Sequence, residues 1–191
     1  TKSQRMEGKD TVSHANALAY YADSYAAKVI ALVKQAKLSV VSCPLINCTM
    51  QGRYDHYPKG RGITRIKELN ASKVNVCIAH DDIQTPFYPF GNGNILQAAH
   101  MGAHLSHMNG ENEIAQIIQM ITYNGAKAFG LQEYGIEVGY IANFIVLPVD
   151  NIVDMVSKQP ACSFVFREGK LVVETKPTEP IWYSDLLNQA R

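Results

Sequence analysis

Metal-competent side chains stand at the ends of two short apolar runs in this sequence. His14 follows the first run, and His80-Asp81-Asp82 follows the third. Imidazole and carboxylate groups suit a borderline metal such as zinc or iron. If the runs are parallel strands, their carboxyl ends converge on one face and these side chains lie close together. Spacing alone leaves a plainer alternative open, in which His14 caps a strand and Asp81 or Asp82 begins a turn.

The elements that must position these side chains alternate between strand and helix. Three short β-branched runs predict buried strands at residues 11–14, 39–43 and 74–79. Between them, residues 17–36 carry apolar side chains at helical spacing and predict a long amphipathic helix, and residues 63–72 predict a shorter one. This order is typical of parallel α/β units and favours a (β/α)₈ barrel or an open doubly wound sheet.

The pattern changes after the third strand. Residues 94–108 and 111–130 predict two more helices, the first capped by Asn94. The chain then turns to β-structure, with a strand at 141–147 and a hairpin within 162–174.

Two domains follow from this order of elements. We expect an α/β domain over residues 1–140, and a small β-domain with an extended tail over residues 141–191. Hydrophobic residues make up 47% of the 191 residues and charged residues 18%, which is ordinary for a chain that buries a core.

Composition and charge argue against several classes of partner. The net charge is +1 with no basic stripe, so we expect no nucleic-acid partner. No run of about 18 apolar residues exists, so we expect no membrane span. The four cysteines form no C-x-x-C pair, and Cys43 and Cys77 lie inside apolar runs as small core residues. This usage favours a reduced, cytoplasmic setting. The polar start resembles no secretory signal and lacks an initiator Met, so we expect the natural beginning to lie elsewhere.

The remaining histidines are weaker candidates for chemistry. His100, His104 and His107 lie at helical spacing, but Met101 stands where an H-E-x-x-H motif needs Glu. We therefore assign these three to packing or solvent contact, and His56 to a loop that could line a pocket.

Longer segments form a combination that is more specific than any one of them. They are Pro44-Leu45-Ile46-Asn47, Gln51-Gly52-Arg53-Tyr54-Asp55, Arg61-Gly62-Ile63-Thr64-Arg65-Ile66-Lys67-Glu68, Ala79-His80-Asp81-Asp82, Pro86-Phe87-Tyr88-Pro89-Phe90-Gly91, Leu96-Gln97-Ala98-Ala99-His100-Met101-Gly102 and Tyr134-Gly135-Ile136-Glu137-Val138-Gly139 with Ala142-Asn143. From about Val12 to Val173, the chain resembles the bacterial cytosine deaminases of the amidohydrolase superfamily.

The resemblance implies both a fold and a reaction. The fold is α/β, the carboxy-terminal part of a metal-dependent-hydrolase (β/α)₈ TIM barrel (strands six to eight) plus a small β-sandwich. The reaction is hydrolytic deamination of cytosine to uracil and ammonia, in pyrimidine salvage. A divalent metal ion, iron or zinc, activates the attacking water. The expected partners are a small-molecule amino-heterocycle and further copies of the chain in a homo-oligomer.

The resemblance also assigns roles to four residues. Asp81 would be the metal ligand and the base that takes a proton from the water. His14 would hydrogen-bond the activated water and stabilise charge in the tetrahedral intermediate. Asp82 would help to orient the substrate, and Phe87 would flank its ring.

Two departures from the family pattern shape the expected function. Phe87 stands where the family usually has Trp, which leaves open a triazine, isoguanine or creatinine-like ring as substrate. The H-x-H and H-x-x-E motifs that supply most metal ligands are absent, and a catalytic metal usually needs three protein ligands. We therefore expect the chain to be an inactive fragment of an enzyme. A non-catalytic half-barrel module is the alternative from a different class.

Overall fold

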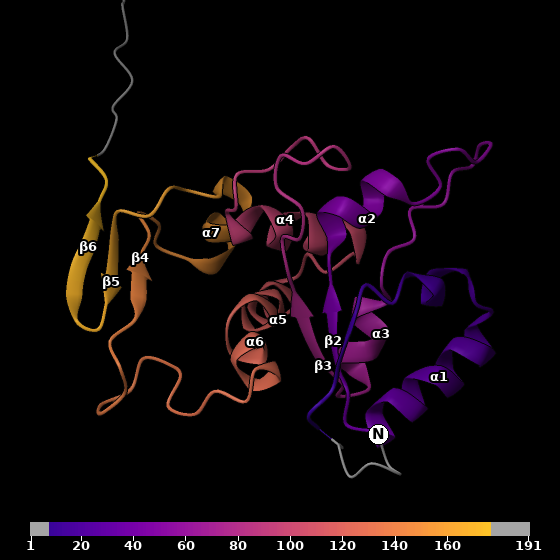
Figure 1. Ribbon diagram of the computed structural model, residues 1–191, viewed down its shortest axis with the longest axis horizontal. Helices are drawn as coiled ribbons and strands as arrows, with labels where there is room; N and C mark the ends of the chain where they lie inside the picture. Colours follow the sequence, from indigo (N-terminus) through magenta and orange to yellow (C-terminus); the bar gives the residue numbers. More distant parts are fainter. Residues whose placement is uncertain (1–7, 177–191) are drawn as a thin grey trace, which may run out of the picture. The chain divides into compact units, whose positions relative to one another are not determined.

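The three predicted strands form one parallel sheet in the order β1-β2-β3. They are β1 (Thr11–Ser13), β2 (Ser39–Ser42) and β3 (Asn75–Ile78). Val12 lies opposite Val40, and Val40 lies opposite Val76. A computed structural model describes residues 8–176, and Figure 1 shows β2 and β3 side by side and pointing the same way. The α/β prediction is confirmed.

Helices connect these strands and cover them. They are the 3₁₀ helix η2 (Asn16–Tyr20), α1 (Asp23–Gln35), α2 (Pro44–Met50), α3 (Ile66–Ala71), α4 (Ile95–Leu105), α5 (Glu111–Ile121), α6 (Tyr123–Ala128) and α7 (Ile152–Lys158). Strand β3 contacts α3, α4, α5 and α6. The core between sheet and helices includes Val40, Val76, Ile66, Leu69 and Ile117, all almost fully buried. No helix among the described residues is long and apolar enough to cross a membrane.

The long helix predicted over residues 17–36 is wrong, because the structure breaks it into η2 and α1. Arg65 binds the chain on both sides of the break. Its guanidinium donates hydrogen bonds to the backbone oxygens of Leu18 and Tyr21, each at 2.7 Å. These bonds hold the segment between η2 and α1 in place.

The helix predicted over residues 111–130 is likewise divided, at Thr122, into α5 and α6. Side chains from both sides hold α6 against β3. Asn124 donates to the backbone oxygen of Val76 at 2.7 Å, and Asn75 donates to the backbone oxygen of Asn124 at 3.1 Å. These contacts hold the segment after Thr122 against β3. They join residues far apart in the sequence, so the spacing of apolar residues along one helix does not predict them.

The prediction of β-structure over residues 141–175 misses α7. Asn151 begins this helix, because its side-chain oxygen accepts a hydrogen bond from the backbone nitrogen of Asp154 at 2.8 Å. Helix α7 packs on α4 and α5, and Nδ1 of His100 lies 3.1 Å from the backbone oxygen of Val156. Residues 149–159 therefore belong with the α/β part.

The described chain divides into two compact units. The first comprises residues 8–140 and 149–159, and the second comprises residues 141–148 and 160–176. The second unit is an antiparallel sheet of β4 (Phe144–Val146), β5 (Phe164–Arg167) and β6 (Lys170–Glu174), in that order. Phe144 and Phe166, on neighbouring strands, stack with their ring centres 4.7 Å apart. Most of the predicted tail lies outside the described residues.

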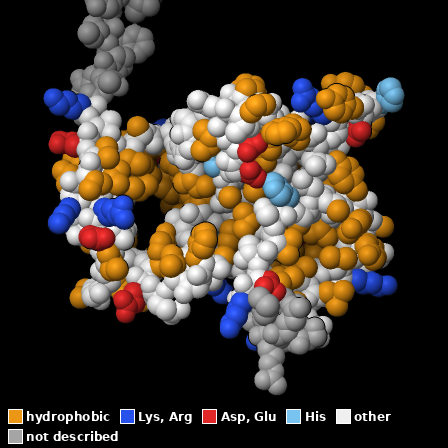
Figure 2. Space-filling view, viewed as in Figure 1, with side chains coloured by type: hydrophobic (Ala, Val, Ile, Leu, Met, Phe, Trp, Pro, Cys, Tyr) orange, Lys and Arg blue, Asp and Glu red, His pale blue; other side chains and the backbone are white. Residues whose placement is uncertain are grey.

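Apolar side chains are exposed in both units. Strand β1 is an edge strand, and all three of its residues are exposed. A closed barrel has no edge strand, so β1 has the exposure of a strand in an incomplete barrel. Figure 2 shows hydrophobic side chains, in orange, over much of the face drawn.

Candidate functional site

His14 and Asp81 face each other across the ends of two strands. Nε2 of His14 lies 3.4 Å from Oδ2 of Asp81. His14 is the first residue after β1, and Asp81 follows β3 by three residues. Both backbones turn into the left-handed region, each with a φ of 66°. The strand ends thus bring together two residues that are 67 positions apart in the sequence, as the sequence predicts for parallel strands.

Both the backbone and the ring of His14 are held by neighbours. Its backbone nitrogen donates to the oxygen of Val41 at 2.8 Å, and its backbone oxygen accepts a hydrogen bond from the hydroxyl of Thr64. Nδ1 of the ring lies 3.0 Å from Oδ1 of Asn47, on α2. Thr64 and Asn47 are both buried, so the partners that orient His14 are themselves fixed inside the fold.

Cys43 is a third member of the cluster, which sequence reasoning read only as a core residue. Donor atoms of His14, Cys43 and Asp81 all lie within 4.8 Å of one another. Cys43 is buried, and its Sγ is 3.9 Å from the hydroxyl of Ser13. Burial, followed by the Asp81 carboxylate, raises the pKa of the Cys43 thiol to about 12. Its position immediately after a strand was the signal that could have identified it.

The loop after Asp81 carries the two predicted substrate contacts. Oδ2 of Asp82 accepts a hydrogen bond from the hydroxyl of Thr85 at 3.0 Å, and that hydroxyl accepts one from the backbone nitrogen of Tyr88 at 3.2 Å. Asp82 therefore braces its own loop. Phe87, two residues beyond Thr85, is 64% exposed.

His80, the first residue of the predicted metal-competent group, is packed behind the site. It is buried, and its Nε2 lies 3.3 Å from Oε1 of Gln97 on α4. Gly91 returns so close that a Cβ there would be 2.4 Å from Cε1 of His80. His80 therefore connects both ends of the loop to α4.

The histidines of α4 pack as the sequence indicated. The rings of His100 and His104 lie 4.3 Å apart, and Nδ1 of His104 is 2.9 Å from the backbone oxygen of His100. These contacts are local to the helix, apart from the link from His100 to α7.

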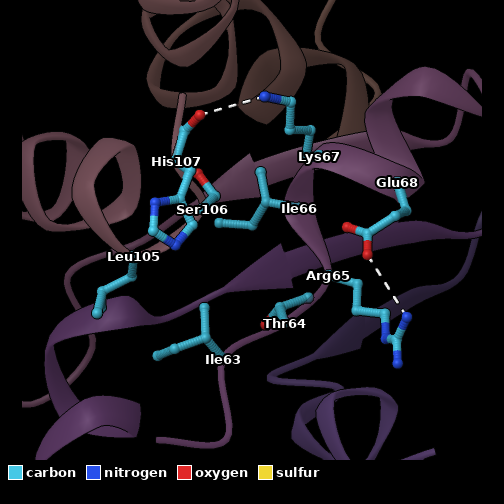
Figure 3. A pocket seen from close by; sticks show the side chains of 9 residues that line it. All are labelled: Ile63, Thr64, Arg65, Ile66, Lys67, Glu68, Leu105, Ser106 and His107. Atoms are coloured by element: carbon cyan, nitrogen blue, oxygen red, sulfur yellow. Dashed lines mark hydrogen bonds and ion pairs between the residues drawn. The ribbon is translucent and has the colours of Figure 1, made fainter. Parts of the chain in front are cut away.

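A separate cavity of about 380 Å³ is lined by residues 63–68 and 105–107 (Figure 3). Its two cationic side chains already have partners. Lys67 pairs with Glu113 at 2.6 Å and donates to the backbone oxygen of His107, and Arg65 pairs with Glu68 at 3.5 Å besides its bonds to the η2 region. The charged side chains of this cavity thus already form ion pairs and hydrogen bonds within the fold. The cluster of His14, Cys43 and Asp81 remains the better candidate for chemistry.

The donor set of that cluster suits a borderline divalent metal. Imidazole nitrogen, carboxylate oxygen and sulfur are all ligands of zinc, and imidazole and carboxylate also bind iron. Asp81 contributes an anionic oxygen at the strand ends, where metal ligands from other strands of a barrel would converge.

Comparison with known proteins places the chain among hydrolases. Residues 1–173 match the model of the amidohydrolase family. The chain is 28% identical over 172 residues to the pterin deaminase of Rhizobium rhizogenes (strain K84 / ATCC BAA-868), covering 89% of this chain and 39% of that protein. It is 27% identical over 173 residues to the N-isopropylammelide isopropyl amidohydrolase of Pseudomonas sp. (strain ADP), covering 88% and 39%. The chain thus spans about two fifths of the length of these curated relatives.

A solved structure with the same fold is also close in sequence. The 5-methylcytosine deaminase of Klebsiella pneumoniae, crystallised with phosphonocytosine, superposes with a TM-score of 0.89 at 35% identity. The match covers 94% of this chain and 44% of that chain. The predicted fold, part of a metal-dependent-hydrolase (β/α)₈ barrel with a small β-sheet, is confirmed.

Proposed function

Because the chain belongs to the amidohydrolase family, we propose that the protein it forms part of removes an amino group hydrolytically from a heterocycle, with cytosine as the first candidate. The observation that carries this proposal is the pairing of His14 with Asp81 at the strand ends, 3.4 Å apart. The likeness to a 5-methylcytosine deaminase supports the choice of a cytosine-type ring.

A divalent metal ion, iron or zinc, fits this site. Asp81 would hold it, with His14 and Cys43 at its side. When bound, such an ion supplies a Lewis acid that lowers the pKa of water towards neutrality. Since the chain spans about two fifths of the length of its curated relatives, we expect the 191 residues by themselves to be inactive.

The residues of the chain would handle the protons of the reaction. The Asp81 carboxylate is placed to accept a proton from the attacking water. Nε2 of His14, 3.4 Å from Oδ2 of Asp81, is close enough to share that proton and to donate a hydrogen bond to the oxygen on which negative charge develops. Each group therefore acts at a defined atom, and the same pair can pass the proton to the amino group, which leaves as ammonia when the C–N bond breaks.

The substrate ring would be bound by the loop after Asp81. Phe87 exposes enough of its ring to lie against a planar heterocycle, and Asp82 can accept hydrogen bonds from ring nitrogens. A pterin is the second candidate substrate, because the pterin deaminase aligns with 89% of this chain at 28% identity.

A substrate panel on the full-length protein tests the proposal. Cytosine, 5-methylcytosine, pterin and N-isopropylammelide are compared by kcat/KM with zinc or iron bound. We expect cytosine-type rings to lead, and we expect Asp81→Asn to lower kcat/KM by about 10³-fold or more.

Asp150→Asn is the matched control, because it makes the same change at an exposed carboxylate. If another ring is preferred, the cytosine assignment fails. If no ring is deaminated and the protein binds no metal, the non-catalytic module becomes the better interpretation.

A further inference from the structure

We propose that Asn47 is a positioning residue, which holds the His14 ring so that Nε2 points at Asp81. This inference deepens the proposed function, and its catalytic part rests on it. The structural part concerns the ring of His14 alone and can be tested without substrate or metal.

The His14 ring lies between two oxygen atoms from different elements. Oδ1 of Asn47 is 3.0 Å from Nδ1, and Oδ2 of Asp81 is 3.4 Å from Nε2. A ring turned over about its Cβ–Cγ bond would put the carbon atoms Cδ2 and Cε1 in place of the two nitrogens and lose both contacts. The Asn47 amide therefore holds the ring in the orientation in which Nε2 faces the reactive side.

Asn47 itself sits on a fixed support. Helix α2 begins at Pro44 directly after β2. The backbone nitrogen of Asn47 donates to the oxygen of Cys43 at 3.1 Å, and the nitrogen of Gln51 donates to the oxygen of Asn47 at 2.9 Å. The end of a core strand thus determines where the amide stands, with only the two torsions of its own side chain left free.

The burial of Asn47 points to a role for its side chain. It is 3% exposed, and its neighbours Leu45 and Ile46 are buried apolar residues. A polar amide in such surroundings costs free energy unless it is hydrogen-bonded, and an apolar residue would fill the same place without that cost. The contact with His14 supplies a hydrogen-bond partner for this buried amide.

The chemical consequence concerns the proton on the ring. The Asn47 oxygen is an acceptor, so its contact with Nδ1 holds a proton on that ring nitrogen. A partner of this kind on the far ring nitrogen is how active sites set the tautomer and orientation of a histidine.

Nitrogen NMR of the metal-free, ¹⁵N-histidine-labelled full-length protein, with all variants at the same pH, tests the proposal. The His14 signals are identified by their loss in His14→Gln. In the wild type we expect a protonated Nδ1. Asn47→Leu should shift the Nδ1 signal towards that of an unprotonated nitrogen, whereas Asn47→Asp keeps an acceptor and should leave Nδ1 protonated.

Thr49→Val is the matched control on the same helix. It removes the 3.0 Å hydrogen bond from Thr49 to the backbone oxygen of Leu45, which does not involve His14. This variant should leave the His14 signals unchanged. Unchanged His14 signals in Asn47→Leu would overturn the proposal. If Asn47→Leu does not fold, a Nδ1 that loses its proton in Asn47→Asp overturns it equally.

Kinetics then separate this inference from the proposed function. Asn47→Leu should lower kcat by about 10- to 100-fold, while KM stays within about twofold. Asn47→Asp should recover most of kcat. A shifted Nδ1 signal in Asn47→Leu, in a protein that deaminates nothing, would leave the positioning role standing and refute the deaminase. Full kcat in Asn47→Leu alongside a shifted Nδ1 signal would refute the catalytic part of the inference.

Discussion

Replacing Gly91 with Ala should displace His80 and disturb the loop that carries the candidate substrate contacts. Gly91 lies at the far end of this loop, with a φ of +84°. An added Cβ would stand 2.4 Å from Cε1 and 2.9 Å from Nε2 of His80. His80 is buried and bonded to Gln97, so its ring has little room to move away.

The expected loss of stability has two parts, the steric overlap of the new Cβ with His80 and the left-handed backbone at residue 91. Carbon atoms in contact normally lie about 3.5–4.0 Å apart, so the clash with His80 exceeds 1 Å by this standard. Overpacking of that kind costs about 1–3 kcal/mol. A left-handed backbone adds about 1–2 kcal/mol for any residue with a Cβ. Gly91→Ala should therefore lower the free energy of unfolding by about 2–5 kcal/mol, the sum of the two.

Gly93→Ala is the matched control, because its φ of +80° carries the same backbone cost. Its Cβ would meet Cδ1 of Ile83 at 3.5 Å, an ordinary contact. Denaturant midpoints at a constant m-value give the difference between the two variants, which we expect to be about 1–3 kcal/mol. Adding His80→Ala to Gly91→Ala should recover part of the loss by making room. Equal destabilisation by the two glycine variants would refute the packing argument.

Two further predictions concern ionisable groups. Burial raises the pKa of Cys43 to about 12 and that of Cys77 to about 11, so at about pH 8 less than about one thiol in 10² is ionised at either position. Mass spectrometry after iodoacetamide treatment should find both unmodified until the protein is unfolded, and rapid native labelling of Cys43 would contradict this. The hydrogen bond from Lys67, together with the backbone nitrogen of Gly110, holds the pKa of Glu113 below its usual value of 4.5. The stability from this contact is present above that value and is lost as the pH falls through the lowered pKa, so Glu113→Gln should weaken the acid dependence of the unfolding midpoint. An unchanged acid dependence would show that the contact does not persist in solution.

The strands could be predicted because their signal is local. Each is a short β-branched run that ends at a polar residue or Pro, and the parallel direction of the strands follows from the alternation with helices. The breaks within the predicted helices could not be foreseen in this way. The contacts that hold one of them in place come from Arg65, more than 40 positions away from the carbonyls that it binds, and those at the other come from Asn75 and Asn124.

The candidate site was only partly accessible to the same reasoning. Strand ends pointed to His14 and Asp81, because convergence at one face is a property of the fold and not of the particular sequence. Cys43 and Asn47 were missed as site residues because apolar neighbours surround both in the sequence. Their position relative to His14 depends on how α2 begins after β2, which the pattern did not reveal.

The backbone conformation of His14 and Asp81 links the fold to the chemistry. Both have a φ of 66°, which is uncommon for residues with a side chain, although His and Asp tolerate it better than most. At His14 the surroundings enforce it, because Val41 binds the backbone nitrogen while Thr64 binds the backbone oxygen. The turn ends the alternation of side chains along β1 and directs the imidazole across the strand ends. Eight other non-glycine residues of the described chain also have a positive φ, so the conformation alone does not mark a site. What distinguishes these two positions is that the turn at each of them brings its side chain to the same point at the strand ends, where the two face each other.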